Sequence, residues 1–283
     1  MQLACVLEVV APKPGNVSLG ASFHDTHAED FLASAAAIGP VFASACTQPL
    51  GWTIRAAIEA TRRWTAVNTN LGIVLLLAPL ARASCDHRSG TLRDRLGTIL
   101  SRTTVEDTHD VYAAIRIAAP AGLGRVAEQD VAAPPTIPLR DAMVLAADHD
   151  AIAREYATEF RTTFDVGTPA LVRALGDELS WSEATVETYL TLLAAAPDTH
   201  IARKLGGEEA ATVQRRAREV LAAGGVRRPA GREAIAALDR DLRDPKNARN
   251  PGATADLTAA AIFVALMEGA WPDHREEIHG PAR

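Results

Sequence analysis

Apolar residues recur every three or four positions along most of this chain, which is the spacing that places them on one face of an α-helix. We find no convincing alternating strand pattern and no internal repeat of fixed period. The sequence therefore predicts an all-α protein. The stripes run over residues 31–42, 54–61, 92–100, 111–118, 143–160, 186–193, 213–221, 235–242 and 257–267.

Polar residues just before several stripes are suitable helix caps. Thr26 and Thr53 each precede a stripe, and Ser180 with Glu183 three residues later forms a capping-box signature. The stripe over 143–160 is either one long helix or two closely spaced ones.

The chain length of 283 residues suits one large domain or two small ones. The proline-rich passage 132–138 is the best linker candidate, but the segments on both sides are equally helical. We therefore expect a single multi-helix bundle over residues 1–283, with 132–138 as a long loop and with the functional loops clustered at one end.

Composition and charge exclude several classes of partner. The net charge of −6 argues against a nucleic-acid-binding surface, which needs an excess of basic residues. The most apolar segment, 71–81, is too short to span a bilayer and contains Pro79, so it predicts a buried helix. Cys5, Cys46 and Cys85 lack metal-ligand spacing and are typical of free thiols in a reducing cytoplasm.

Lysine is rare in this chain. Of the 29 basic residues only Lys13, Lys204 and Lys246 are lysines, and each lies beside proline or close to glycine. An arginine-biased genome would explain the depletion. Lysine is also a compact charge for phosphate, and loops at helix ends are common phosphate sites, which favours that role for Lys13 and Lys204.

Two loops in the first quarter of the chain carry candidate chemistry. Two prolines flank Lys13 and Asn16 follows, and further on Asp25 is a plausible oxygen ligand for magnesium beside a polyphosphate. Asn68 and Thr69 precede the apolar segment. They either cap that helix or position a ribose or phosphate at its N-terminus.

Two further loops lie in the last third. Arg203 and Lys204 stand just before Gly206, where an anion could approach closely, and Asp198 is available to a metal or hydroxyl. Asn250 and Asp256 belong to the last loop, with Asp256 expected in the first turn of the final helix. A solvated helix end and a helix-dipole contact would explain both loops equally simply.

Together and in this order, the loops resemble the triphosphoribosyl-dephospho-CoA synthase family, and the resemblance covers essentially the whole chain. The matching pieces are Pro12-Lys13-Pro14-Gly15, Asp25 ahead of 31–35, Asn68-Thr69 with Gly72, 122–124, Asp198-Thr199 with Gly206-Gly207, and 250–252 with 255–257.

The resemblance implies an all-helical enzyme that binds ATP with Mg²⁺ and transfers its triphosphoribosyl unit to dephospho-CoA, releasing adenine. It assigns phosphate binding to Lys13, Arg203 and Lys204, with Gly206 and Asn250 beside them, and contacts to ATP to Asn16, Asn68 and Thr69. Catalytic roles fall to Lys13, Asp25 and Asp256, and metal binding to Asp25, Asp198 and Asp256. A homo-oligomer is possible under this resemblance.

This sequence departs from the family pattern at two places. Asn70 and Leu71 replace the family's His-Lys, and Phe23 stands where a histidine is usual, with His24 one position later. The changes leave open another acceptor in coenzyme biosynthesis. They also leave open a magnesium-dependent nucleotide or ADP-ribose hydrolase, and a nucleotide-binding protein without catalysis.

Overall fold

A computed structural model describes residues 1–86, 89–126 and 128–271, and across these residues every regular element is a helix. The prediction of an all-α protein is confirmed. The helices are α1 Gln2–Val10, α2 Ala28–Phe42, α3 Leu50–Arg62, α4 Leu71–Ser84, α5 Leu92–Ser101, α6 Val105–Ala118, α7 Leu139–Ala146, α8 Ala151–Ala157, the π-helix η1 Thr163–Gly167, α9 Thr168–Gly176, α10 Trp181–Ala195, α11 Thr199–Leu205, α12 Gly207–Ala222, the 3₁₀ helix η2 Gly225–Arg227, α13 Pro229–Leu242 and α14 Gly252–Met267.

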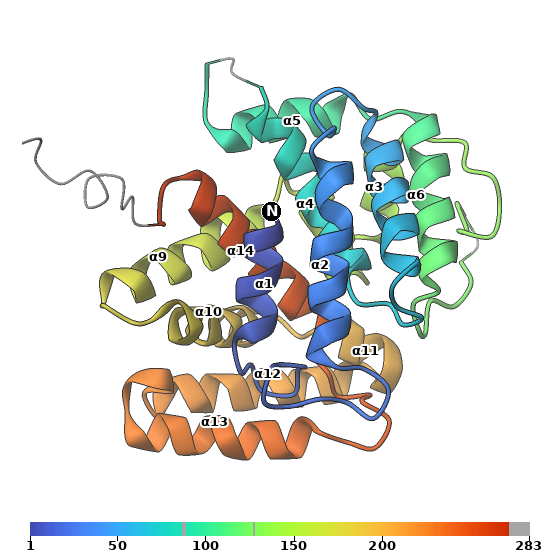
Figure 1. The fold of residues 1–283 in the computed structure, drawn as a ribbon. Helices are drawn as coiled ribbons and strands as arrows, with labels where there is room; N and C mark the ends of the chain where they lie inside the picture. The colour runs from blue at the N-terminus through green and yellow to red at the C-terminus, as the bar shows by residue number, and fades with distance from the viewer. Residues whose placement is uncertain (87–88, 127, 272–283) are drawn as a thin grey trace, which may run out of the picture.

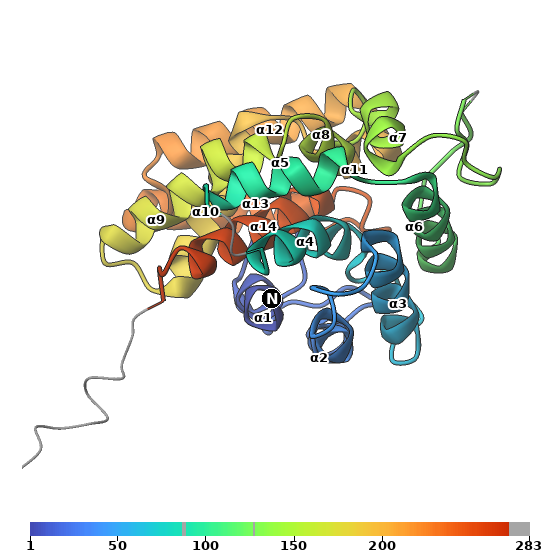
Figure 2. The same ribbon diagram turned by 90° about the horizontal axis from the view of Figure 1, so that it is seen from above.

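Two helices, α4 and α14, form the centre of the molecule. Except for Gly72, every residue from Leu71 to Ala81 is buried, which confirms the buried helix expected there. The second view shows α4 and α14 between α1 and α2 on one side and α5 and α10 on the other (Figure 2). Both helices are apolar all round because neighbours cover them on every side.

The remaining helices surround this centre as pairs. α3 packs against α6 at one side, and α12 lies beside α13 at one end of the molecule (Figure 1). One large core cluster lies around α4 and α14, and a second one fills the space between α10, α11, α12 and α13. Because α10 and α14 contribute to both clusters, we keep the prediction of a single domain. Residues 272–283, which the prediction included, lie outside the described residues.

Local sequence signals located some helix starts correctly. Ser180 and Glu183 form the predicted capping box, in which the Glu183 carboxylate accepts from the Ser180 amide at 3.0 Å. Thr104 caps α6, since its side chain accepts from the Asp107 amide. The stripe over 143–160 is a pair of helices, α7 and α8, and α7 begins directly after the predicted loop 132–138.

Two predicted caps were wrong. His27, not Thr26, is the N-cap of α2 and forms a capping box with Asp30. Thr53 lies inside α3, where its hydroxyl donates to the carbonyl of Pro49, which is the N-cap. A threonine hydroxyl can satisfy a carbonyl one turn earlier as readily as a free amide, so sequence position alone did not separate the two cases.

The prediction of three free cysteines was also wrong. Cys46, in the turn after α2, and Cys85, at the C-terminal end of α4, form a disulfide with a Cα–Cα distance of 5.5 Å. Packing brings these ends together, and the Arg82 guanidinium donates to the carbonyl of Ala45 beside the bond. Only Cys5 is free, and it is buried. Within the described residues no helix is both long and apolar enough to cross a membrane.

Candidate active site

A cleft of about 1050 Å³ opens where the loops before α2, α4, α11 and α14 meet. All four loops that the sequence singled out contribute to it, although they are far apart along the chain. The predicted residues that line the cleft are Asn16, Asp25, Asn68, Thr69, Arg203, Lys204, Asn250 and Asp256. Lys13, Asp198 and Gly206 do not line it.

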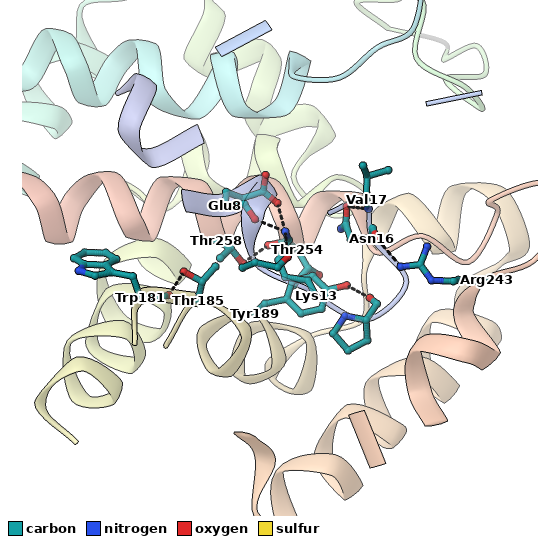
Figure 3. Close-up of polar contacts among 12 residues, drawn as sticks. Glu8, Lys13, Asn16, Val17, Trp181, Thr185, Tyr189, Arg243, Thr254 and Thr258 are labelled. Carbon is teal, nitrogen blue, oxygen red and sulfur yellow. Dashed lines mark hydrogen bonds and ion pairs between the residues drawn. The ribbon is translucent and has the colours of Figure 1, made fainter. Parts of the chain in front are cut away.

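Lys13 lies behind the cleft wall and is buried, with its side chain fully covered. Its ammonium pairs with the Glu8 carboxylate at 2.9 Å and also donates to the backbone carbonyls of Glu8 and Ala11 (Figure 3). These contacts occupy its three donors, so the structure does not place Lys13 against a phosphate. Its function here is to hold Glu8, which does line the cleft.

The turn that follows Lys13 is fixed by helices from the far end of the chain. The Tyr189 hydroxyl of α10 donates to the Pro14 carbonyl at 2.8 Å, and the Gly15 amide donates to Asp239 of α13 at 2.8 Å. Arg243, just after α13, donates to the Asn16 carbonyl at 2.8 Å (Figure 3). These contacts hold the turn in place and orient Asn16 at the cleft.

Asp198 was expected at a metal or a hydroxyl, and the geometry argues against both. Its carboxylate caps α11 by accepting from the amides of His200 and Ile201. The other oxygen accepts from the amide and hydroxyl of Thr254 at 2.8 and 2.7 Å. Both oxygens are thus occupied, and Asp198 joins α11 to α14. Gly206 is the left-handed residue at the end of α11, with φ of 93°, and has a structural role.

Asp256 occupies the inner part of the cleft. It lies one turn further into α14 than expected, because that helix already begins at Gly252. Its carboxylate lies against the backbone of α4, where a Cβ on Gly72 would be 2.0 Å from Oδ2. Burial raises the pKa of Asp256 well above its ordinary value, and the nearby carboxylates of Glu8, Asp198 and Asp150 raise it further. None of the described residues donates a hydrogen bond to this carboxyl group.

Basic groups lie along the α11 side of the cleft. Arg203 pairs with Asp150 at 3.3 Å, and the Lys204 ammonium donates to the Asn247 carbonyl at 3.2 Å. Burial and the charge of Arg203 lower the pKa of Lys204. Lys246 also lines the cleft. An anion bound here would find cations that are only partly neutralised by the protein.

His200 lies between these cations and α14. Burial, with the charges of Lys204 and Arg203, lowers its pKa to about 3, so its imidazole is neutral at physiological pH. The ring fits only because residue 252 is glycine, since a Cβ there would be 2.2 Å from Nδ1.

The loop before α4 combines capping with contact to the cleft. The Asn68 side chain accepts from the Leu71 amide at 3.1 Å, while Asn70 is the N-cap of α4 and makes no side-chain capping bond. The Thr69 hydroxyl is 2.6 Å from that of Ser34 on α2. Asp25 is exposed at the mouth and accepts from Asn247 at 3.4 Å.

Four buried polar atoms at the cleft have no partner among the described residues. They are Asn16 Nδ2, Asn70 Oδ1, Arg203 Nε and Asn250 Oδ1, and all four residues line the cleft. Buried polar groups are normally hydrogen-bonded, so their concentration here indicates that a polar ligand or water completes the site.

Several lining residues were missed by sequence reasoning. Glu8, Arg62, Asp150, His200 and Lys246 all face the cleft. Glu8 left a visible signal, because an acid stands among apolar residues of α1. Asp150 is the N-cap of α8, a role that gives no sign of a functional site. Its position near Asp256 depends on tertiary packing that the local sequence does not encode.

The carboxylates fit a magnesium ion better than a structural transition metal. No group of three or more histidine, cysteine or acidic side chains converges as a metal cage in the described ranges. Magnesium usually takes one or two protein carboxylates and completes its shell with phosphate oxygens and water. Glu8 and Asp256, which both line the cleft, would provide such a partial shell.

The fold and cleft define the class as an all-helical protein with one cleft that is lined by carboxyl groups, basic side chains and amides. The family model described as "ATP:dephospho-CoA triphosphoribosyl transferase" (CitG) matches residues 1–275. The chain therefore belongs to this family, in agreement with the resemblance seen in its loops.

Individual relatives agree with this assignment. The chain is 28% identical over 90% of its length to a protein from Stutzerimonas stutzeri, of which the match covers 85%, and 35% identical over 42% to one from Pseudomonas savastanoi. Both carry the name "Probable 2-(5''-triphosphoribosyl)-3'-dephosphocoenzyme-A synthase". The second match spans only 40% of the Pseudomonas protein's own length.

A solved structure from Archaeoglobus fulgidus is also similar. That protein, named for triphosphoribosyl-dephospho-CoA synthase, matches with a TM-score of 0.66 and 29% identity. The match covers 84% of this chain and 99% of the other. The chain therefore shares its helical fold with a solved protein that carries the same name as the relatives above.

Proposed function

We propose that this protein transfers the triphosphoribosyl unit of ATP to a ribose hydroxyl of dephospho-CoA and releases adenine. Family membership supports the reaction class. The observation that carries the proposal is that the carboxyl groups of Glu8, Asp150 and Asp256 line the same cleft as the basic side chains of Arg203, Lys204 and Lys246. Such an acidic site favours a cation, and the cationic wall favours the phosphates.

In this reaction the bond between the anomeric carbon of ATP and adenine breaks, and a bond to the acceptor oxygen forms. The acceptor hydroxyl loses a proton, adenine gains one, and all three phosphates stay on the transferred ribose. Positive charge develops on the ribose as adenine leaves, as in glycoside chemistry. The carboxylates of the cleft stabilise that charge.

Each group in the cleft has a role under this proposal. Arg203, Lys204 and Lys246 bind phosphate oxygens, and Asn16 and Asn250 hydrogen-bond the polar parts of the substrates through their free amide atoms. Asp25, exposed at the mouth, is our candidate for the carboxylate that accepts the proton of the acceptor hydroxyl.

Magnesium is part of the proposal. Glu8 and Asp256 would hold the ion, with Lys13 keeping Glu8 in place from behind. When bound, the ion supplies positive charge that neutralises the triphosphate and orients it. Action in the cytoplasm and assembly as a homo-oligomer stay predictions.

Removing the charge at Asp256 tests the proposal. Asp256→Asn should lower acceptor-dependent adenine release by at least about 100-fold, since one preorganised charge at a reacting centre contributes on this order. Glu219→Gln, which removes the same charge from the exposed face of α12, is the matched control and should keep full activity. Equal activity in the two variants would remove Asp256 from the site and refute the proposal as stated.

A further inference from the structure

The cleft has a second half that the proposed chemistry does not use. Away from Glu8 and Asp256 it is bounded by α6, α7, the start of α8 and segments 119–126 and 128–131. We name this half the aliphatic trough, and six of the residues that line it are Val111, Ile115, Leu123, Met143, Leu145 and Ile152.

Hydrogen bonds fix the wall of the aliphatic trough. The Tyr112 hydroxyl donates to the Gln129 carbonyl at 2.5 Å, and the Gln129 side chain is bonded to Thr136 in turn. Asp130 accepts from the amides of Val126 and Ala132 at 2.9 and 2.8 Å. These bonds fix segment 128–131, which lines the cleft, against α6.

Apolar side chains at the rim of the trough remain exposed to solvent. Leu145 is 54% exposed and Leu123 is 44% exposed, although both line the cleft. Deeper in, Val111 and Met143 are buried. Large exposed apolar side chains that continue into a cleft mark a binding surface for an apolar group.

The trough is suited to an aliphatic ligand rather than to a purine. A nucleobase favours a free aromatic face for stacking. The aromatic rings among the described lining residues, histidines apart, are Phe23, Phe31 and Tyr112. Phe23 and Phe31 belong to the separate cluster around Val17, and Tyr112 is buried with its hydroxyl engaged.

The trough also adjoins the cationic wall. A Cβ on Gly122, in segment 119–126, would lie 3.2 Å from Cγ of Arg203. A ligand that crosses this boundary must carry an anionic part joined to an uncharged aliphatic part. ATP has no such part, whereas dephospho-CoA joins a diphosphate to a pantetheine arm.

We propose that the aliphatic trough binds the pantetheine arm of the acceptor, with the attached diphosphate beside Arg203. The inference rests on the proposed function for the identity of the acceptor. It assigns acceptor selection to α7 and segment 119–126, a region separate from the carboxylates that perform the chemistry.

Two neighbouring residues of α7 provide the test. Leu145 lines the trough, while Val144, 49% exposed, does not. Leu145→Asp should raise the KM for dephospho-CoA about tenfold, as expected when one apolar contact is replaced by a charge. Its KM for ATP should stay within about twofold, and Val144→Asp should behave as wild type in both.

Calorimetry with dephospho-CoA and with ADP, which lacks the arm, separates this inference from the proposed function. Leu145→Asp should weaken binding of dephospho-CoA and leave binding of ADP unchanged. If both aspartate variants bind dephospho-CoA equally, or if Leu145→Asp raises the KM for ATP instead, the trough does not hold the arm. If wild type binds dephospho-CoA in a Leu145-dependent way but releases no adenine, the trough stands and the proposed reaction fails.

Discussion

At the scale of single residues, the carboxyl group of Asp256 combines burial with three acidic neighbours. Its pKa in the folded protein is raised above the ordinary value of 3.8. The folded state therefore binds this proton more tightly than the unfolded state. The resulting stabilisation is complete below about pH 3.8 and is lost as the pH rises through the folded pKa.

A pH series of melting temperatures tests this assignment. In metal-free buffer the Tm of Asp256→Asn should rise relative to wild type between about pH 4 and pH 8, by about 2–4 °C for each kcal/mol of difference. Added Mg²⁺ should reduce the gap, because a bound cation offsets the repulsion in wild type only. A gap that is constant with pH, or insensitive to Mg²⁺, would contradict the account.

Lys13 was predicted to bind phosphate, but in the structure it pairs with Glu8 and supports that residue. The flanking prolines and the charge of Lys13 indicated a functional loop, and the loop does reach the cleft through Asn16. The Lys13 side chain is buried, and the turn that carries it is bonded to α10 and α13, which are distant in the sequence. No local pattern could distinguish a phosphate lysine from one that pairs with a buried acid.

The buried pair predicts a stability cost for Lys13→Met. Removing one partner leaves the Glu8 charge uncompensated and should cost about 3–5 kcal/mol of unfolding free energy, together with most activity. The double variant Glu8→Gln/Lys13→Met should recover most of that stability, but no activity, because the cleft carboxylate is still missing. Chemical denaturation checks both variants. Wild-type stability in Lys13→Met with loss of ATP binding would instead restore a direct phosphate role.

At the scale of helices, the sequence was informative mainly where the signal was local, although the Thr26 and Thr53 cap predictions were wrong. Apolar periodicity located most of the helices, and Ser180 with Glu183 located the start of α10. It was not informative where tertiary contacts decided the outcome. The Cys46–Cys85 disulfide joins two residues that are 39 positions apart in the sequence. The Asp198 carboxylate accepts from the hydroxyl of Thr254, which belongs to another helix.

The contact of α13 with the turn at Asn16 gives a prediction at this scale. Arg243→Ala removes the guanidinium that holds the Asn16 carbonyl and should raise the KM for ATP several-fold with little change in kcat. Arg240→Ala, at an exposed position of the same helix, is the control. Steady-state kinetics on both variants check the effect. A change in kcat alone, or no difference between the variants, would show that this contact does not position the turn.

At the scale of the whole molecule, the fold brings four distant loops to one cleft around α4 and α14. That convergence accounts for the spread of the family motifs from the first helix to the last, since each loop supplies one part of the site. Asn70 and Leu71, which depart from the family pattern, both line the cleft. The two replacements therefore lie where the substrates would bind. For this reason, the identity of the product is the decisive test of the proposed reaction.

The most direct measurement is mass analysis of the products formed from ATP, Mg²⁺ and dephospho-CoA. The account predicts one adenine for each nucleotide adduct, with all three phosphates of ATP retained on the transferred ribose. Release of adenine with free ribose triphosphate, independent of dephospho-CoA, would indicate a hydrolase and contradict the account. Binding of ATP without any adenine release would contradict it as well.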